Sequence, residues 1–520
     1  MLRTDSDLSR IHSHVKGCKS EKHRPHCAPN KLAVGLVNYP QVTAKQLRPA
    51  HAGSSSSARL AAILFLACAG VIEGLVTVFA GGPIAQSPGD PRTWGLICCS
   101  LAGLLGVSYW AVMRPSFEFD SRLEQLAFLV PVYAFWQVLP LPIAWIRIVS
   151  PARANLAYAL QPITSVPHWV PISATPSATL YHGLLFSACA SLFFVTHDLS
   201  KRFARRSWIV AIPLIVVGVG QAAIGLLQAG SGTDGLATGT YLIRNHYAGF
   251  LEMVLPFCAL IPLASASSRE TDAPLGDNSL RMAAVLLGCL GIAIAALIFA
   301  AISSSLSRTG YVVSLTSIAF IVIAALGRRI PPRRIPLVAA AVAVGAVMLA
   351  LLLPSARMIT RFADLEENGN DRSPVWHDTL GLIRTYPIFG CGLGAYDSAF
   401  LEFKRSYPAL NQDYAHNDYL QYLAEMGALG FAILILPLAT VLLRLRAGIL
   451  HGRPDIRWLS LACAGSALAI GLHSFVDFNF YVPANLFTFA WILGISASIG
   501  QQAQRAETTP LQPRSGFSSQ

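Results

Sequence analysis

The sequence predicts an all-α polytopic membrane protein with about twelve transmembrane helices. Of its 520 residues, 53% are hydrophobic and only 13% are charged, whereas soluble domains usually carry about 25% charged residues. The mean hydropathy is +0.51. Apolar runs of roughly 20 residues, the length that crosses a bilayer core of about 30 Å, recur along the chain. Together these observations exclude an ordinary soluble globular protein.

The expected spans follow from the apolar runs taken in order. They fall at about 59–80, 94–113, 124–147, 179–197, 207–228, 246–267, 282–303, 310–327, 336–353, 417–443, 457–476 and 485–500.

This reading divides the chain into five regions. They are a disordered basic cytoplasmic tail (1–57), transmembrane helices 1–9 (58–353), a loop on the outer face (354–415), transmembrane helices 10–12 (416–500) and a cytoplasmic C-terminal tail (501–520). The tail is expected to contact anionic membrane lipids through its basic residues.

The distribution of positive charge predicts the orientation. The net charge is +12, and the basic connections at 201–207, 327–334 and 444–457 alternate with poorly charged ones. The positive-inside rule therefore places both termini in the cytoplasm. Because the Lys and Arg residues lie in short loops between spans instead of on one soluble face, we expect no nucleic-acid partner.

Cysteine and histidine usage predicts no metal or cofactor. Most of the ten cysteines stand singly inside apolar runs, where cysteine behaves as a small hydrophobic residue. Cys18, His23, His26 and Cys27 gather in the N-terminal tail, but their spacing matches no strong zinc pattern. No disulfide framework is expected either.

Several arginines fall on the predicted outer face, where topology alone disfavours positive charge. Arg244 and Arg308 each stand at the start of an apolar helix, and Arg372 and Arg384 lie in the long loop. An isolated arginine at a membrane edge often extends to the lipid headgroups. Arginines that converge near helix N-termini instead form an anion site, because the helix ends add partial positive charge and Arg binds phosphate through paired hydrogen bonds.

The stretch HNDYLQYLAEMGALG, residues 416–430, opens another long apolar helix with titratable groups. At 100° per residue, His416 shares a face with Gly427 and Gly430, while Asp418 and Glu425 lie opposite. A carboxylate that orients His416 must therefore come from another segment. His416 is either a polar cap at the membrane surface or a general base. Asp418 and Glu425 are expected to hold this helix to its neighbours.

The long loop is expected to contain an amphipathic helix at the membrane interface. Trp376, Leu380 and Ile383 recur at helical spacing after Ser373. Pro387 ends this helix, and GCGLG at 390–394 forms a tight turn.

An anion site and a base beside apolar helices suit a substrate with a lipid tail and a phosphate linker. The predicted reaction is displacement of a diphosphate lipid by a hydroxyl group. A transporter or flippase of lipid-linked anionic saccharides would use the same arginines without a base. A non-catalytic scaffold in an export complex is a third alternative.

Five stretches occur here in an order that resembles the O-antigen ligase and Wzy-type O-antigen polymerase family of bacterial inner-membrane proteins. They are RNHYAGFLEMVLP, LSRTGY, RSPVWHDTLGLIRTYPIFGCGLGAY, HNDYLQYLAEMGALG and HSFVDFNFYVPAN, the last at 473–485. The resemblance covers roughly residues 120–500.

The resemblance implies a metal-independent glycosyltransferase of GT-C-like architecture with a periplasmic active site. Its substrate would be a glycan on undecaprenyl diphosphate, and its acceptor either a lipid A core or a second lipid-linked glycan. By motif, Arg244 and Arg308 would bind the diphosphate and His416 would activate the acceptor. Arg372 and Arg384 are weaker candidates for glycan or phosphate contacts. His473 and Asp477 match the last motif, without an assigned role.

Overall fold

The computed structural model describes residues 54–81, 91–113, 121–159, 161–231, 235–272, 278–327, 358, 360, 372–406 and 412–508. Both predicted tails, apart from a few residues at their edges, and the expected span at 336–353 lie outside these ranges. So does part of the predicted loop at 354–415.

The described chain is almost entirely helical. Its long helices are α1 (Ser54–Phe79), α2 (Pro91–Met113), α3 (Ser121–Val138), α6 (Pro176–Arg202), α7 (Ile212–Ser231), α8 (Arg244–Asp272), α9 (Asn278–Ser304), α10 (Arg308–Gly327), α15 (Asp418–Leu450), α16 (Pro454–His473) and α17 (Pro483–Thr508). Within the described ranges, ten helical stretches are long and apolar enough to cross a membrane. They correspond to ten of the twelve predicted spans, so the all-α polytopic class is confirmed.

The predicted span at 124–147 is too long. Helix α3 ends at Val138, and the chain continues as strand β1 (Leu141–Pro142) and the short helix α4 (Ile143–Val149). Pro140 and Pro142 explain the difference, because proline lacks an N–H donor and disfavours helical geometry in the residue before it. Periodicity alone could not separate the two pieces, since both are apolar.

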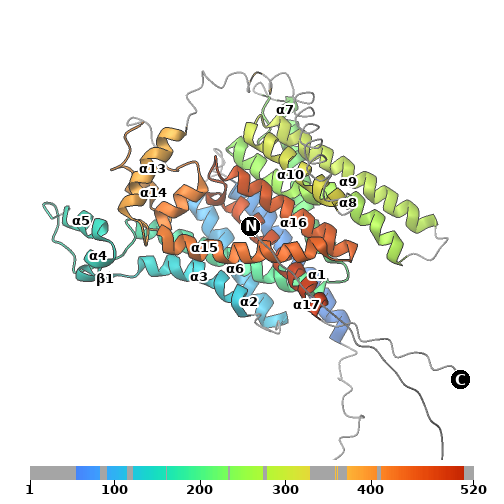
Figure 1. Cartoon of the computed structure of the whole chain (residues 1–520), viewed down its shortest axis with the longest axis horizontal. Helices are drawn as coiled ribbons and strands as arrows, with labels where there is room; N and C mark the ends of the chain where they lie inside the picture. The colour runs from blue at the N-terminus through green and yellow to red at the C-terminus, as the bar shows by residue number, and fades with distance from the viewer. Residues whose placement is uncertain are drawn as a thin grey trace, which may run out of the picture. The chain divides into compact units, whose positions relative to one another are not determined.

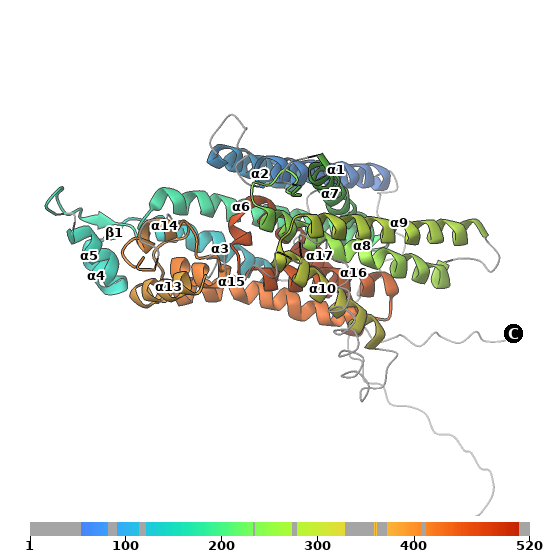
Figure 2. The same ribbon diagram turned by 90° about the horizontal axis from the view of Figure 1, so that it is seen from above.

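Helices distant in sequence pack together in one bundle. Helix α8 lies against α9 and α16, and α17 packs against α6, α15 and α1. Helices α1, α2 and α7 follow one edge of the bundle when it is seen from above (Figure 2). The side chain of Trp491 on α17 is fully buried and donates a hydrogen bond to the carbonyl of Val210. Helix α17 therefore belongs to the core of the bundle.

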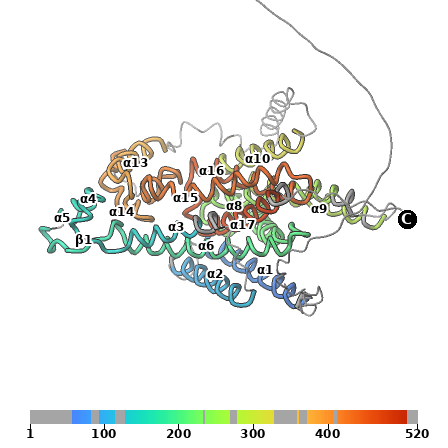
Figure 3. Tube along the Cα trace, turned by 60° about the horizontal axis from the view of Figure 1, so that its bottom comes forward, coloured from blue at the N-terminus to red at the C-terminus, as the bar shows by residue number. Residues whose placement is uncertain are grey.

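Short elements gather at one end of the long helices. Helices α4, α5 (Pro151–Ala159), α13 (Ser373–Thr385) and α14 (Tyr396–Phe400) lie there together with β1 (Figures 1 and 3). Strand β1 pairs antiparallel with β2 (Trp169–Val170), with Pro142 opposite Trp169. The amide of Ala174, which follows β2, donates to the carbonyl of Cys391, which lies between α13 and α14. This bond joins the segment with α4, α5, β1 and β2 to the segment with α13 and α14.

Helix α15 is broken at Gly427, whose φ of 63° and ψ of −178° are not helical. The amides of Cys391 and Gly392 donate to the carbonyls of Ala424 and Glu425, and the amides of Ala428 and Leu429 donate to those of Pro387 and Ile388. These bonds use the backbone groups that the break leaves unpaired, as helix breaks at membrane depth require. The loop after α13 therefore approaches the backbone at Gly427 closely.

Candidate active site

The turn between α16 and α17 places a buried carboxylate at the end of the bundle. Asp477 is 1% exposed, and its Oδ1 accepts a hydrogen bond from the amide of Phe478 at 3.0 Å. The side-chain amide of Asn245, in the first turn of α8, donates to Oδ2 at 2.8 Å. The ring nitrogen Nε2 of His246 lies 3.6 Å from Oδ1. Asp477 thus joins the start of α8 to the end of α16.

His416 shares this carboxylate. Its Nδ1 lies 3.4 Å from Oδ1 of Asp477, and its side chain is 32% exposed. When Asp477 is ionised it can only accept, so Nδ1 carries the proton and Nε2 keeps its lone pair. The ring of Phe478 meets the His416 ring edge to face, with centroids 4.9 Å apart. The arrangement can orient a neutral imidazole whose free nitrogen accepts a proton.

The backbone at His416 adopts a left-handed conformation with a φ of 51°. Among the described residues, Leu306 is the other non-glycine residue with positive φ, and it lies two residues before Arg308. Such conformations cost about 1–3 kcal/mol and are concentrated at functional sites. Directly after His416, the side chain of Asn417 caps α15 by accepting from the amide of Leu420 at 3.1 Å. His416 is therefore held by the cap on one side and Asp477 on the other.

Arg372, just before α13, extends to the same carboxylate. Its guanidinium lies 3.7 Å from Oδ2 of Asp477. Burial by itself raises the pKa of Asp477, but the neighbouring His246 and His416 rings and the charge of Arg372 outweigh it and hold this pKa well below its ordinary value. Asp477 is therefore a carboxylate at neutral pH, which defines the tautomer of His416.

Arg244 and Arg308 begin two helices that pack against each other at this end. Arg244 is the first residue of α8 and Arg308 the first of α10. The helices approach so closely that a Cβ atom on Gly310 would lie 2.5 Å from the Cβ of Ala248. Gly310 lies two residues after Arg308, and Ala248 lies four residues after Arg244. Helix α8 also carries Asn245, which donates to Asp477. The structure thus brings Arg244, Arg308, Arg372 and His416 to one end of the bundle.

Arg384 lies apart from this group. It occupies the last turn of α13, twelve residues beyond Arg372, and is exposed. At 1.5 Å per residue, that separation is about 18 Å along the helix.

The polar residues on the other face of α15 bind the α16–α17 turn, as predicted. The backbone amide of Asp418 donates to the carbonyl of Ser474 at 2.9 Å. The Oδ2 atom of Asp418 accepts from the amide of Phe480 at 3.3 Å. Glu425 accepts from the Tyr481 hydroxyl at 2.6 Å and from the amide of Gly394 at 2.6 Å. The same turn that carries Asp477 is thereby fastened to the helix that follows His416.

The apolar stripe predicted for α13 is not the face that packs against the protein. Leu380 is exposed, while Val375, Asp378, Thr379 and Leu382 are buried. The Asp378 carboxylate accepts from the amides of Arg405 and Ser406, each at 2.9 Å. These donors explain why the Asp378 carboxylate is buried.

His473 forms a second histidine–carboxylate pair deeper in the bundle. Its Nδ1 lies 3.1 Å from both oxygens of Glu252 on α8, and both side chains are completely buried. This pair joins α8 to the last turn of α16, four residues before Asp477. It is closed to substrate and fixes the helices that carry the site.

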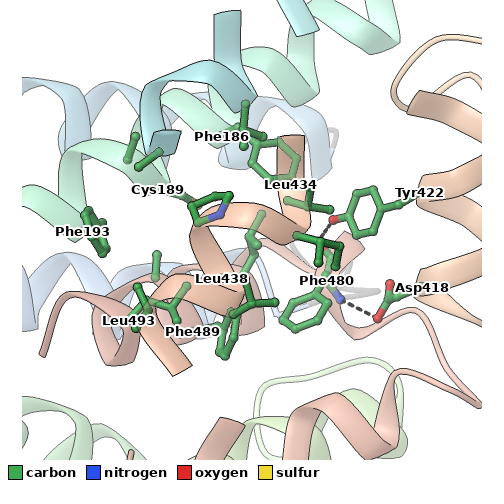
Figure 4. A pocket seen from close by; sticks show the side chains of 18 of the residues that line it. Phe186, Cys189, Phe193, Asp418, Tyr422, Leu434, Leu438, Phe480, Phe489 and Leu493 are labelled. Atoms are coloured by element: carbon green, nitrogen blue, oxygen red, sulfur yellow. Dashed lines mark hydrogen bonds between the residues drawn. The ribbon is translucent and has the colours of Figure 1, made fainter. Parts of the chain in front are cut away.

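An apolar cavity of about 240 Å³ lies beside α15, between α3, α6 and α17. Figure 4 shows Phe186 and Phe193 of α6, Leu434 and Leu438 of α15, and Phe489 and Leu493 of α17 around it. Asp418 and Tyr422 lie at one end, where dashed lines mark their bonds to Phe480 (Figure 4). The cavity has room for hydrocarbon and reaches the helix turn that follows His416.

The sequence predicts His416 and the arginines as site residues but assigns no role to the residues that contact them. Asp477 appears there only within the last motif, without an assigned role, and Asn245 and His246 only within the motif that begins at Arg244. Within the described residues, no group of three or more His, Cys, Asp or Glu side chains is placed to hold a metal ion.

Comparison with known families supports the resemblance. Residues 293–435 match the family model described as O-antigen ligase, Wzy_C. No curated protein matches the chain. The matched segment contains Arg308, Arg372, Arg384 and His416, whereas Arg244 and Asp477 lie outside it. Residues 293–435 of this multi-pass membrane protein are therefore an O-antigen ligase family domain.

Proposed function

We propose that this protein transfers a glycan from undecaprenyl diphosphate to an acceptor hydroxyl at the periplasmic face of a bacterial inner membrane. The O-antigen ligase domain implies glycosyl transfer from lipid-linked glycans. The observation that carries the finer proposal is the His416–Asp477 pair beside helix starts that bear arginines. A GT-C-like organisation and independence of metal ions are part of the proposal.

The diphosphate would be bound by Arg244 and Arg308. Each begins a helix, where the unpaired N–H groups and the helix dipole favour an anion. Guanidinium groups add charge-assisted hydrogen bonds. Neutralising the diphosphate stabilises the charge that grows on it as the glycosidic bond breaks.

The acceptor would be activated by His416. Its Nε2 takes the proton of the acceptor hydroxyl while the hydroxyl oxygen attacks the anomeric carbon. The bond from that carbon to the diphosphate oxygen breaks, and undecaprenyl diphosphate leaves with the electron pair. Asp477 stabilises the imidazolium that forms, as a carboxylate does for a general-base histidine. General-base assistance of this kind contributes about 10²–10⁴-fold to the rate.

The isoprenoid tail of the carrier would lie against the apolar helix surfaces that surround the site. The cavity beside α15 supports this placement, because aliphatic and aromatic side chains line it and it reaches the turn after His416. The proposed sidedness is supported by the basic loops, from which the positive-inside rule predicts that the opposite end of the bundle faces the cytoplasm.

The acceptor is tested by supplying purified protein in proteoliposomes with a carrier-linked glycan, alone or together with lipid A core. Growth of the carrier-linked glycan indicates a polymerase, and transfer to the core indicates a ligase. Either outcome must release free undecaprenyl diphosphate.

A transporter or flippase would move the intact lipid and release none. The same vesicles, assayed for protection of the lipid-linked glycan from an added glycosidase, would detect such movement. Movement without release of the carrier would contradict the proposed function.

A further inference from the structure

The segment between α3 and α6 forms a small unit with apolar side chains on its outside. Ile146, Val170 and Ile172 make its core. Trp145 is nevertheless 61% exposed, Ile148 is 82% exposed and Trp169 is 61% exposed. We call these three residues the apolar patch. Exposed patches that contain large aromatic side chains usually mark an interaction surface.

The three side chains of the patch lie close together in the fold. Trp145 and Ile148 are one turn apart on α4, so they share a face. Trp169 pairs with Pro142, the residue directly before α4. All three residues therefore belong to the same small unit, and Trp169 is paired to the strand that leads directly into α4.

Exposed apolar residues also precede the patch in the chain. Phe128, Leu129 and Val132 on α3 are exposed, and Leu139 is exposed just beyond its end. From there the chain enters β1 and α4 within a few residues. No acidic residue interrupts the chain between these exposed apolar residues and α4.

The charge around the patch favours an anionic membrane surface. Residues 139–175 contain no Asp or Glu, but they contain Arg147 and Arg153. Arg147 is exposed and lies between the two patch residues of α4. Tryptophan and basic residues beside aliphatic ones are typical of segments at the boundary between headgroups and acyl chains.

We propose that the apolar patch inserts into the headgroup–acyl boundary of the bilayer, with anionic headgroups bound at Arg147. The unit is tied to the broken helix, since Ala174 donates to Cys391 and the amide of Cys391 donates to Ala424 of α15. Insertion of the patch would thus anchor the loop after α13 to the membrane, and this loop holds the first half of α15. This lipid contact is independent of the transfer reaction.

The test uses the full chain in vesicles of phosphatidylethanolamine and phosphatidylglycerol. The exposed Cys68 and Cys289, together with Cys18 and Cys27, are replaced by alanine to reduce background labelling. An environment-sensitive fluorophore is then placed at position 148 through I148C, and at exposed Glu402 through E402C as the control. The fluorescence of the chain with the four cysteines replaced, but without I148C or E402C, is measured after the same labelling and subtracted.

We expect blue-shifted emission at position 148 and loss of intensity with lipids that carry a quencher near the headgroup. The probe at 402 should keep the emission of an aqueous probe. Replacing Arg147 with glutamine, or phosphatidylglycerol with phosphatidylcholine, should reduce the quenching at 148.

Two outcomes would overturn the proposal. Emission at 148 equal to that at 402 would mean that the patch faces water. Blue-shifted emission whose intensity does not fall with quencher lipids would mean that protein, such as a second copy of the chain, covers the patch. Neither outcome bears on whether the protein transfers glycans.

Discussion

The Nδ1 atom of His416 lies 3.4 Å from Oδ1 of Asp477, a residue 61 positions later in the chain. Position 416 precedes α15 and position 477 follows α16, so the pair exists only because the two helices pack side by side. The helical wheel had required that a partner for His416 come from another segment. Asp477 is that partner.

Replacing His416 should abolish transfer while leaving the protein in the membrane. We expect His416→Asn to lower the rate by about 10²–10⁴-fold, because asparagine tolerates the left-handed backbone but cannot act as a base. Release of undecaprenyl diphosphate by purified variant in vesicles measures the effect. His416→Gly serves as the control for backbone strain, since it relieves the strain and must still be inactive. Normal turnover in both variants would contradict the assignment of His416 as the general base.

Asp477→Asn should reduce turnover by orienting His416 less well and by leaving its protonated form without a carboxylate. We expect kcat to fall while the apparent KM for the lipid-linked glycan changes little, because Asp477 is buried and does not reach the substrate. Steady-state kinetics of Asp477→Asn and of the wild-type protein in the same vesicles would show this. A change in KM alone would instead indicate that Asp477 shapes the binding site.

The depressed pKa of Asp477 predicts how stability depends on pH. Its stabilising contribution is present above the unfolded-state pKa of about 3.9 and is lost as pH falls through the lower folded-state value. The apparent melting temperature of the wild-type protein in detergent should therefore fall below about pH 4. In Asp477→Asn this part of the decrease should be missing, and parallel curves for the two proteins would contradict the prediction.

Arg308→Ala should weaken use of the diphosphate donor by about tenfold to hundredfold, the range for a hydrogen bond to a charged group. Arg308→Lys should recover only part of the loss, because lysine provides a point charge without the paired donors. The ratio kcat/KM measured against the lipid-linked glycan reports both changes. Full recovery by lysine would mean that charge alone matters there.

Arg372, just before α13, and Arg384, in the last turn of α13, form a matched pair. Arg372 contacts Asp477, whereas Arg384 is about 18 Å away along α13. We expect Arg372→Ala to lower kcat/KM clearly and Arg384→Ala to leave it near the wild-type value. Equal losses would show that substrate extends along the whole of α13.

Gly427→Ala should destabilise the junction between α15 and the loop after α13. A Cβ atom at Gly427 would lie 2.4 Å from the backbone of Ile388, and its φ of 63° favours glycine. The strained backbone alone costs about 1–3 kcal/mol. Gly103→Ala is the control, because that helical glycine has nothing within 4 Å of an added Cβ. Melting temperatures in detergent should fall for the first variant and not for the second.

The sequence by itself determined the class of the protein, most of its spans and the identity of its candidate base. These features depend on composition, on apolar length and on local order, all of which can be read along the chain. It also separated Asp418 and Glu425 from His416, because helical periodicity alone decides which side chains share a face.

Only the tertiary structure decided which residues meet. Asp477, Asn245 and Arg372 come from three segments whose ends are adjacent only after the helices pack, so no local pattern could join them. It likewise broke α15 at Gly427, where backbone hydrogen bonds to a distant loop replace those that the helix gives up. Local periodicity describes one helix at a time, whereas a site at the end of a bundle depends on contacts between several.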